Sequence, residues 1–203
     1  MTQTIPNFEN QLCASSTHFV NGKDMFSGFP DGTEQVQLGM GCFWGAERIM
    51  WKLGGVHVTS VGYAGGHTAD PDYPKTCKGD TGHAEMVHMV YDPKVISFDE
   101  ILKAFFENHD PTQGDRQGND RGPQYRSAIF TYTDDQMSRA KEAAERYAEA
   151  YGRPVTTELR EAPTYFAAED YHQQYLAKNP QGYCMHGPTG IVCHLPERAP
   201  EKV

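Results

Sequence analysis

Residues 39–53, GMGCFWGAERIMWKL, hold a lone cysteine, Cys42, between a glycine and two large aromatic residues. Just before it, residues 34–41 alternate enough to predict a β-strand. After Cys42, apolar residues recur at the spacing of one helical face: Ala46, Ile49, Met50 and Leu53. Gly54 and Gly55 are expected to end this helix. The stretch therefore predicts a strand that runs into a short helix, with a thiol at the junction.

The size and charge of the chain limit its class. It has 203 residues, enough for a single domain with a sizeable core. Its net charge of -9 and its pI near 5.4 argue against a nucleic-acid surface or an anionic membrane as the main partner. No apolar run approaches the length of a membrane span, and residues 1–16 lack the basic and apolar regions of a secretory signal.

The cysteines indicate a compartment. There are five of them, an odd number, and they are widely scattered in a chain of ordinary composition. A disulfide scaffold is therefore not expected, and a reducing cytoplasm with reactive or merely buried thiols fits better. Nothing in the sequence marks a dimer interface, so a monomer is the default expectation.

The periodic segments predict the fold. Residues 1–33 predict an irregular arm packed on the body, residues 34–180 the body that carries the chemistry, and residues 181–203 a flexible tail rich in Gly and Pro. Further strands are expected at residues 56–66, 83–93, 125–133 and, last, 155–162. Helices are expected after the capping boxes Ser97–Glu100 and Thr133–Gln136, and at residues 165–176. Strands and helices interleave without strict alternation, which predicts an α+β fold: a two-layer α/β sandwich with a mixed sheet and a ferredoxin-like core.

The position of Cys42 suggests reactivity. At a helix start, unpaired backbone N–H groups and the helix dipole favour a thiolate over a thiol. Phe43 and Trp44 are suited to frame a small apolar pocket beside the sulfur, the size of a methyl group. The alternative is a buried cysteine that serves only strand-to-helix packing.

Glu85 is the second candidate. In the strand predicted for residues 84–91 it shares a face with three apolar residues, Val87, Met89 and Tyr91. A carboxyl group on an apolar face has a raised pKa, and its protonated form can donate a proton to an oxygen that gains charge. The alternative is a carboxylate at a strand edge or paired with an arginine. His83 is expected to be a hydrogen-bonding partner and His88 a surface residue.

The segment GYCMHGPTGIVCH carries two more thiols, Cys184 and Cys193. Thiols on a mobile segment can exchange disulfides with a third thiol elsewhere. The competing interpretation is a zinc site made of Cys184, His186, Cys193 and His194, although their spacing does not match the usual paired ligands. Cys13 and Cys77 receive no role.

Several motifs together resemble one family. They are GCFWGAE, GYAGG, TCKGDTGHAE, VYDP, ENHDPTQGDRQGNDRGPQYRSAIF, AEDYHQQYLAKNP and the pair GYC and GIVC. In this order, over about residues 34–195, the chain resembles peptide methionine sulfoxide reductase A, in its type with two cysteines in the tail. That family is the known repair route for methionine sulfoxide.

The resemblance implies roles for the first four residues. Cys42 attacks the sulfoxide sulfur, Phe43 and Trp44 hold the methyl group of the substrate, and Glu85 protonates the departing oxygen. The product is methionine, and Cys42 is left as a sulfenic acid. The resemblance further implies reduction of the S epimer at sulfur, with no cofactor and no metal.

The remaining roles also come from the resemblance. Tyr73, Tyr125 and Asp120 bind the oxygen side of the substrate. Cys184 is the resolving thiol and Cys193 the recycling thiol, so that a redox-active disulfide passes among Cys42, Cys184 and Cys193. The substrates are then oxidised methionine in proteins and free methionine sulfoxide, and the reductant is thioredoxin or another thiol.

One departure leaves the order of the relay open. Family members often have a run of glycines between the two tail cysteines, whereas this chain has the bulkier MHGPTGIV. Two other classes stay as alternatives: a non-enzymatic redox sensor built on Cys42, and a zinc-binding module built on the tail. Neither explains the linked motifs around Glu85, Tyr73 and Tyr125.

Overall fold

A seven-stranded mixed sheet forms the centre of the computed structural model, which describes residues 3–193. Its strands, in spatial order, are β10 (Glu158–Glu161), β9 (Ser127–Thr131), β4 (Glu34–Met40), β6 (Ala84–Tyr91), β5 (Val56–Ala64), β11 (Tyr165–Ala167) and β2 (Phe8–Glu9). Neighbouring strands are antiparallel except for β10 with β9 and β11 with β2, which are parallel. The predicted mixed sheet is confirmed.

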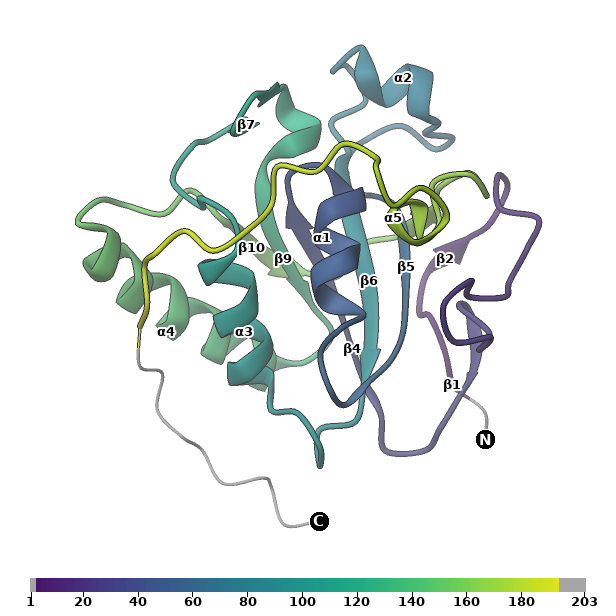
Figure 1. The fold of residues 1–203 in the computed structure, drawn as a ribbon, viewed down its shortest axis with the longest axis horizontal. Helices are drawn as coiled ribbons and strands as arrows, with labels where there is room; N and C mark the ends of the chain where they lie inside the picture. Colours follow the sequence, from purple (N-terminus) through teal and green to yellow (C-terminus); the bar gives the residue numbers. More distant parts are fainter. Residues whose placement is uncertain (1–2, 194–203) are drawn as a thin grey trace.

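Three helices lie on one side of this sheet: α1 (Phe43–Met50), α3 (Phe98–Glu107) and α4 (Asp134–Tyr151) (Figure 1). The chain order β4, α1, β5, β6, α3, β9 and the spatial order β9, β4, β6, β5 are those of a ferredoxin-like unit. The α+β prediction is therefore correct. Within residues 3–193, no helix combines the length and apolar character needed to cross a bilayer.

The helix ends follow the sequence signals. Ser97 and Glu100 form a complete capping box at the start of α3. Thr133 caps α4 by accepting the N–H of Gln136, whereas the Gln136 side chain accepts the N–H of Tyr132. At the far end of α4, Gly152 is left-handed at φ 65°. These caps leave the apolar faces of α3 and α4 turned toward the sheet.

The opposite face of the sheet is covered by the N-terminal arm, which includes β1 (Gln3–Thr4) and β3 (Ser27–Phe29). Buried arm residues pack there against the sheet: Ile5, Cys13, Met25, Phe26 and Phe29. The prediction of a surface position for His88 is wrong, because the side chain is fully buried. Its ring contacts Phe29 of the arm and the rings of Tyr132 and Tyr165. Its ring nitrogen bonds Gln35 Oε1 at 3.0 Å instead of water.

Residues 165–176 do not form the predicted helix. Tyr165–Ala167 is strand β11, paired with β5, so residues 155–162 do not hold the last strand, and helix α5 is only Tyr175–Lys178. The intervening turn is fixed by tertiary hydrogen bonds. The side-chain amide of Gln173 accepts the N–H of Val61 and donates to its C=O. Gln174 adopts a left-handed φ of 48°. These bonds outweigh the local helix pattern.

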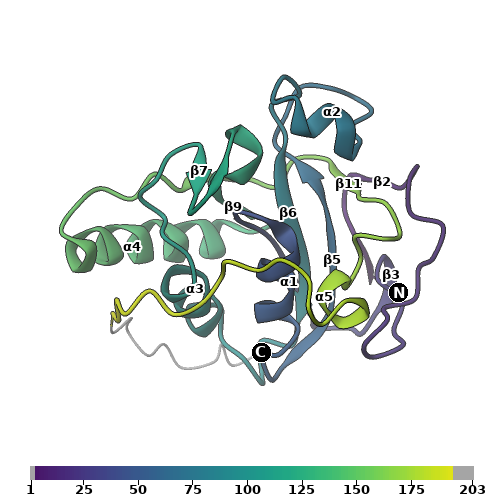
Figure 2. The ribbon, with the colours of Figure 1, turned by 45° about the horizontal axis from the view of Figure 1, so that its top comes forward.

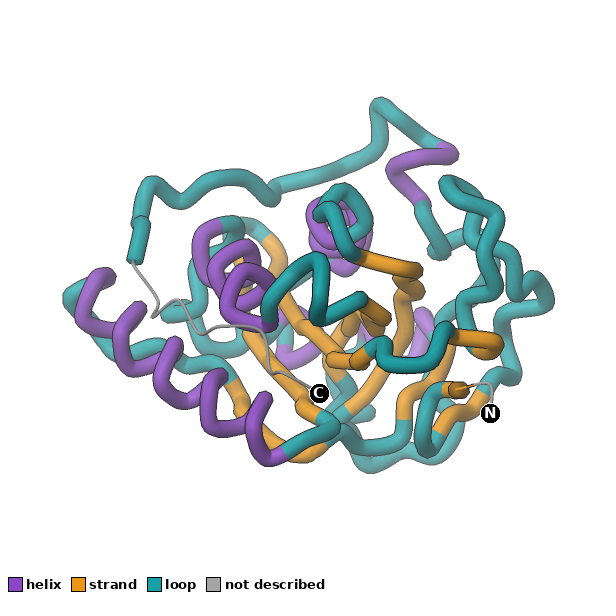
Figure 3. Tube along the Cα trace, turned by 90° about the horizontal axis from the view of Figure 1, so that it is seen from below, coloured by secondary structure: helices purple, strands orange, loops and turns teal. Residues whose placement is uncertain are grey.

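The segment after α5 has no helix or strand up to Cys193. It leaves α5, crosses α1 and α3 and reaches α4 (Figures 1 and 2). In Figure 3 it is the long loop that ends where the grey trace begins, on the outer side of the helices. The rest of the predicted tail, residues 194–203, lies outside the described residues.

Candidate active site

Cys42 lies at the turn between β4 and α1. Gly41 makes the turn possible: its φ is 91°, and a Cβ there would stand 2.5 Å from the side chain of Gln117. Cys42 is the N-cap residue of α1, and its side chain makes no capping hydrogen bond. The sulfur-bearing residue is buried, with 9% of its surface exposed. The predicted strand-to-helix junction is confirmed.

Glu85 approaches the same turn from the sheet. It lies in β6 opposite Tyr63 of β5, on the face that carries Val87 and Met89 into the helix-side core. Its Oε2 accepts the backbone N–H of Phe43 at 3.0 Å. A carboxyl group from the sheet thus satisfies one of the free N–H groups at the start of α1. The side chain pairs with no arginine or lysine in the described residues.

Burial determines the protonation states of Glu85 and Cys42. Burial raises the pKa of Glu85 to about 8, with the N–H of Phe43 opposing the rise and the charge of Asp120 adding to it. Burial, and then the charge of Glu85, raises the pKa of the Cys42 thiol well above its usual range. The N–H groups of Trp44 and Gly45 oppose this only in part.

The prediction of a thiolate in the free site is therefore wrong. An α-helix of 8 residues offers a few N–H groups to the sulfur, and they do not compensate for the loss of water. At neutral pH the substrate-free site holds a thiol on Cys42 beside a protonated carboxyl group on Glu85. Glu85 thus carries a proton next to the thiol of Cys42, and this thiol can act as a nucleophile only if it loses its own proton.

A cavity of about 120 Å³ opens beside these two groups. Its lining residues are Cys42, Phe43, Trp44, Tyr73, Glu85, Asp120, Tyr125 and Tyr183. They come from α1, β6, α2 (Tyr73–Cys77), β8 (Asp120–Arg121), the 3₁₀ helix η1 (Pro123–Tyr125) and the tail. The structure thus brings together the predicted nucleophile, proton donor, methyl-binding aromatics and oxygen-side residues, which lie on separate segments of the chain.

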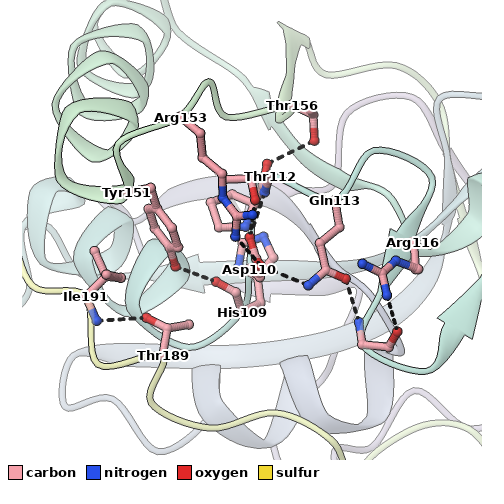
Figure 4. A network of polar contacts seen from close by, with 12 residues as sticks. His109, Asp110, Thr112, Gln113, Arg116, Tyr151, Arg153, Thr156, Thr189 and Ile191 are labelled. Carbon is pink, nitrogen blue, oxygen red and sulfur yellow. Dashed lines mark hydrogen bonds and ion pairs between the residues drawn. The ribbon is translucent and has the colours of Figure 1, made fainter.

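A network of polar contacts holds the loop that carries Asp120. Asp110 accepts hydrogen bonds from the side chains of Thr112 and Gln113, at 2.6 and 2.9 Å, and pairs with Arg153 at 3.0 Å (Figure 4). The following strands, β7 (Arg116–Gln117) and β8, form a short antiparallel pair. The loop between α3 and β9 is therefore a folded structure that presents Asp120 to the cavity.

His172 supports the aromatic wall from behind. It accepts the indole N–H of Trp44 on Nδ1 at 3.0 Å, and its ring centre lies 4.6 Å from that of Tyr73 and 5.0 Å from that of Phe43. Burial lowers the pKa of His172 to about 4, so the ring is neutral and can accept. Tyr175 stacks on Trp44 with ring centres 3.9 Å apart.

Two residues of the site were missed in the sequence. Tyr183 lines the cavity, and its hydroxyl donates to Asp120 Oδ1 at 3.1 Å. Its position next to Cys184 was the available signal. His172 lies within the motif AEDYHQQYLAKNP, but the helix predicted there gave no reason to direct its ring at Trp44.

The tail brings one of its two cysteines to α1. Cys184 Sγ accepts a hydrogen bond from Arg48 Nη2 at 3.0 Å, and a Cβ on Gly45 would stand 2.9 Å from this sulfur. Cys193 lies at the other end of the segment, where its N–H bonds the hydroxyl of Tyr147 in α4. The two tail thiols therefore occupy different places over the helices.

This separation weakens the zinc interpretation. Among residues 3–193, no three potential ligands are close enough to hold a metal ion. His186 bonds the carbonyl oxygen of Met40 near Cys184, Cys193 contacts α4, and His194 lies outside the described residues.

The other two thiols differ in exposure. Cys13 is buried under the arm, where its Sγ donates to Asp170 Oδ1 at 3.1 Å, and burial raises its pKa to about 12. Cys77 is exposed at the end of α2 and shares a hydrogen bond with the hydroxyl of Tyr73.

The site places a thiol beside a carboxyl group that can give a proton. This arrangement suits the transfer of an oxygen atom to the cysteine sulfur, so the fold and site are those of a thiol oxidoreductase. The family model described as "Peptide methionine sulfoxide reductase" matches residues 34–196. The chain belongs to this family.

Similar proteins agree in sequence and in fold. "Peptide methionine sulfoxide reductase MsrA" of Brucella anthropi is 54% identical over 198 residues, which cover 96% of this chain and 91% of the relative. The solved methionine sulfoxide reductase A of Corynebacterium diphtheriae is 45% identical, with a TM-score of 0.78 over 95% of this chain and 96% of that one. Mxr1 of Saccharomyces cerevisiae in reduced form is 34% identical, with a TM-score of 0.73 over 82% and 95%.

Proposed function

We propose that this protein is a peptide-methionine (S)-S-oxide reductase that repairs oxidised methionine in proteins and reduces free methionine sulfoxide. The observation that carries the proposal is the buried pair of Cys42 and Glu85 in one cavity walled by Phe43 and Trp44. A cavity of about 120 Å³ admits a small methyl-bearing group rather than a large substrate.

The chemistry uses the protons that the site holds. Glu85 gives its proton to the sulfoxide oxygen, which makes the substrate sulfur electrophilic. Cys42 loses its proton as its sulfur attacks, and Glu85 is protonated again. The bond between the two sulfurs and the substrate S–O bond then break as the hydroxyl oxygen bonds to the sulfur of Cys42, which becomes a sulfenic acid. The cysteine sulfur is thereby oxidised and the substrate sulfur is reduced to a thioether.

Binding of the oxygen side is assigned to Tyr73, Tyr125 and Asp120. Burial raises the pKa of both tyrosine hydroxyls well above their usual range, so both remain proton donors for hydrogen bonds throughout the physiological range. They reach the cavity from α2 and η1, whereas Trp44 comes from α1. A sulfoxide oxygen accepts such hydrogen bonds, whereas a methyl group does not.

We expect selectivity between the two hands of the substrate. The S epimer at sulfur should be reduced and the R epimer left untouched, because the methyl group is held by Phe43 and Trp44 while the oxygen faces Glu85. Only one hand then presents its sulfur to Cys42. The measurement is methionine formation from each separated epimer with a dithiol reductant, and comparable rates on both would contradict the proposed pocket.

The sulfenic acid is resolved by a relay in this proposal. Cys184 condenses with Cys42 to a disulfide, and Cys193 then exchanges with it. The contact of Cys184 with α1 supports the first step. The distant position of Cys193 means that the second step requires the tail to move, since a disulfide needs Cα atoms within about 7 Å.

Single cysteine variants test this relay. Cys184→Ser should form methionine once and then hold Cys42 as sulfenic acid, because no thiol remains beside it. Cys193→Ser should stop at the Cys42–Cys184 disulfide and turn over poorly with thioredoxin. Mass spectrometry after one equivalent of substrate distinguishes these species, and Cys13→Ser is the control. A Cys193→Ser protein that cycles at the parent rate would show that Cys184 alone suffices.

Thioredoxin is the proposed reductant, and the cytoplasm the proposed location. Mxr1, one of the solved relatives above, has also been solved in complex with Trx2, at 23% identity to this chain in that alignment. All five cysteines are free in this structure, as suits a reducing compartment. The protein is proposed to act as a monomer.

The redox-sensor alternative is less well supported. Sensor cysteines have a low pKa and are accessible to solvent. Cys42 is buried and its pKa is raised, so peroxide in solution is a poor oxidant for it. Oxidation by a substrate bound in the cavity does not have this difficulty.

A further inference from the structure

The segment Tyr183–His186 is seated on the first turns of α1. His186 Nε2 donates to the carbonyl oxygen of Met40 at 2.6 Å, while its buried Nδ1 has no partner. Gly45 makes room for it, since a Cβ there would stand 2.2 Å from His186 Nδ1. Met40 and Gly45 flank Cys42 in the sequence, so His186 docks the tail directly against the reactive turn.

Arg48 is the cation at this docking site. Its Nη2 lies 3.0 Å from Cys184 Sγ, and within the described residues 3–193 no carboxylate is within salt-bridge distance of it. Arg48 stands about 1.7 turns beyond the N-cap residue Cys42, so the same helix carries the reactive cysteine at its start and the guanidinium further along. A guanidinium without a carboxylate partner is free to stabilise charge on the sulfur that it contacts.

We propose that Arg48 activates Cys184 for the resolving step and that His186 is the positioning residue that holds Cys184 in reach. The inference rests on the proposed function, in which Cys184 is the resolving thiol. In the step, Cys184 loses its proton and its sulfur attacks the sulfur of Cys42 sulfenic acid. The S–S bond forms, the S–O bond breaks, and the hydroxide leaves as water with a proton from Glu85. The proton of Cys184 passes to solvent, from which Glu85 is protonated again. Cys184 sulfur is oxidised and Cys42 sulfur is reduced.

His186 belongs to the part of the tail that departs from the family pattern, in which glycines are common. Burial lowers its pKa, so the ring is neutral at pH 7 and docks through one hydrogen bond rather than through charge. A docked tail holds Cys184 near Cys42, whereas a glycine-rich tail would sample many conformations before each condensation. The bulkier insert between Cys184 and Cys193 thus helps to position Cys184 for its condensation with Cys42.

The test separates activation from positioning. Arg48→Met removes the charge and keeps the length of the side chain, Arg48→Lys keeps the charge, and Lys52→Met removes a cation from the residues just after α1 as a matched control. Each protein receives one equivalent of methionine sulfoxide without reductant, and quenched samples are analysed for methionine and for the Cys42–Cys184 disulfide over a range of pH. The readout is the rate of disulfide formation relative to methionine formation in the same protein.

Arg48→Met should lower this ratio about 10-fold or more at neutral pH, the effect of one lost charge-assisted hydrogen bond, and the deficit should shrink as pH rises. Arg48→Lys should restore most of it, and Lys52→Met should leave it unchanged. His186→Ala should lower the ratio by a similar factor at every pH, as loss of position does. A parent ratio in Arg48→Met, or a deficit independent of pH, would overturn the proposal. If the parent protein forms no methionine, the proposed function itself fails, which is a different result.

Discussion

Replacement of Cys42 by serine is expected to abolish methionine sulfoxide reduction, by roughly 10⁴-fold or more. A hydroxyl oxygen is a far weaker nucleophile than sulfur at neutral pH, and it cannot accept the oxygen to form a stable analogue of a sulfenic acid. The measurement is methionine released in a single turnover, which excludes any effect on later steps of the relay.

The same variant should remain folded. Cys42 is an N-cap residue without a side-chain capping bond, and serine is among the preferred residues at this position. Thermal unfolding at or above the parent midpoint would confirm that only chemistry is lost. Cys13→Ser is the matched control, because Cys13 is also buried but packs under the N-terminal arm. Measurable turnover by Cys42→Ser would remove Cys42 from its proposed role.

Glu85→Gln is expected to slow the methionine-forming step by roughly 10²–10⁴-fold, the usual contribution of a positioned general acid. The amide oxygen can still accept the N–H of Phe43, so the start of α1 keeps its partner. Glu47→Gln is the matched control: Glu47 is also a fully buried carboxyl group with a raised pKa, but it bonds Thr59 and Gln174 and does not line the cavity. It should keep its rate even where its unfolding midpoint falls.

The pH profile gives an independent check on Glu85. The pKa of Glu85 is raised to about 8, so the protonated, donating form is present below that pH and is lost as pH rises through it. The single-turnover rate of the parent should therefore hold to about pH 8 and fall above it. Glu85→Gln should show no such fall. A full rate in Glu85→Gln would move the proton donor to Tyr73 or Tyr125.

Much of the fold can be predicted from local sequence patterns. The alternation along β4, the capping box at Ser97 and the glycine at 152 each depend on neighbours within a few residues. Such signals survive in the sequence because side-chain period and end-capping are properties of single elements. The same reasoning placed Cys42 at a strand-to-helix turn and Glu85 on the apolar face of its strand.

Features that depend on residues far apart in the sequence could be determined only from the tertiary structure. His88 was expected at the surface, but it shares its strand face with Met86 and Val90, and Phe29 of the arm packs against its ring. Residues 165–176 looked helical, but hydrogen bonds of Gln173 to β5 prevail. In each case a contact across the fold outweighs a local preference of a fraction of a kcal/mol per residue.

In the candidate active site, too, some features follow from the sequence and others only from the tertiary structure. The sequence by itself determined that Cys42 begins a helix, and from that position alone a thiolate was expected. The protonation state was decided only in three dimensions, because the desolvation of Cys42 and the approach of Glu85 are set by segments far along the chain. The docking of Cys184 on Arg48 is of the same kind. Residue types and local order lie in the sequence, whereas burial, and with it the energy of a charge, exists only once the chain is folded.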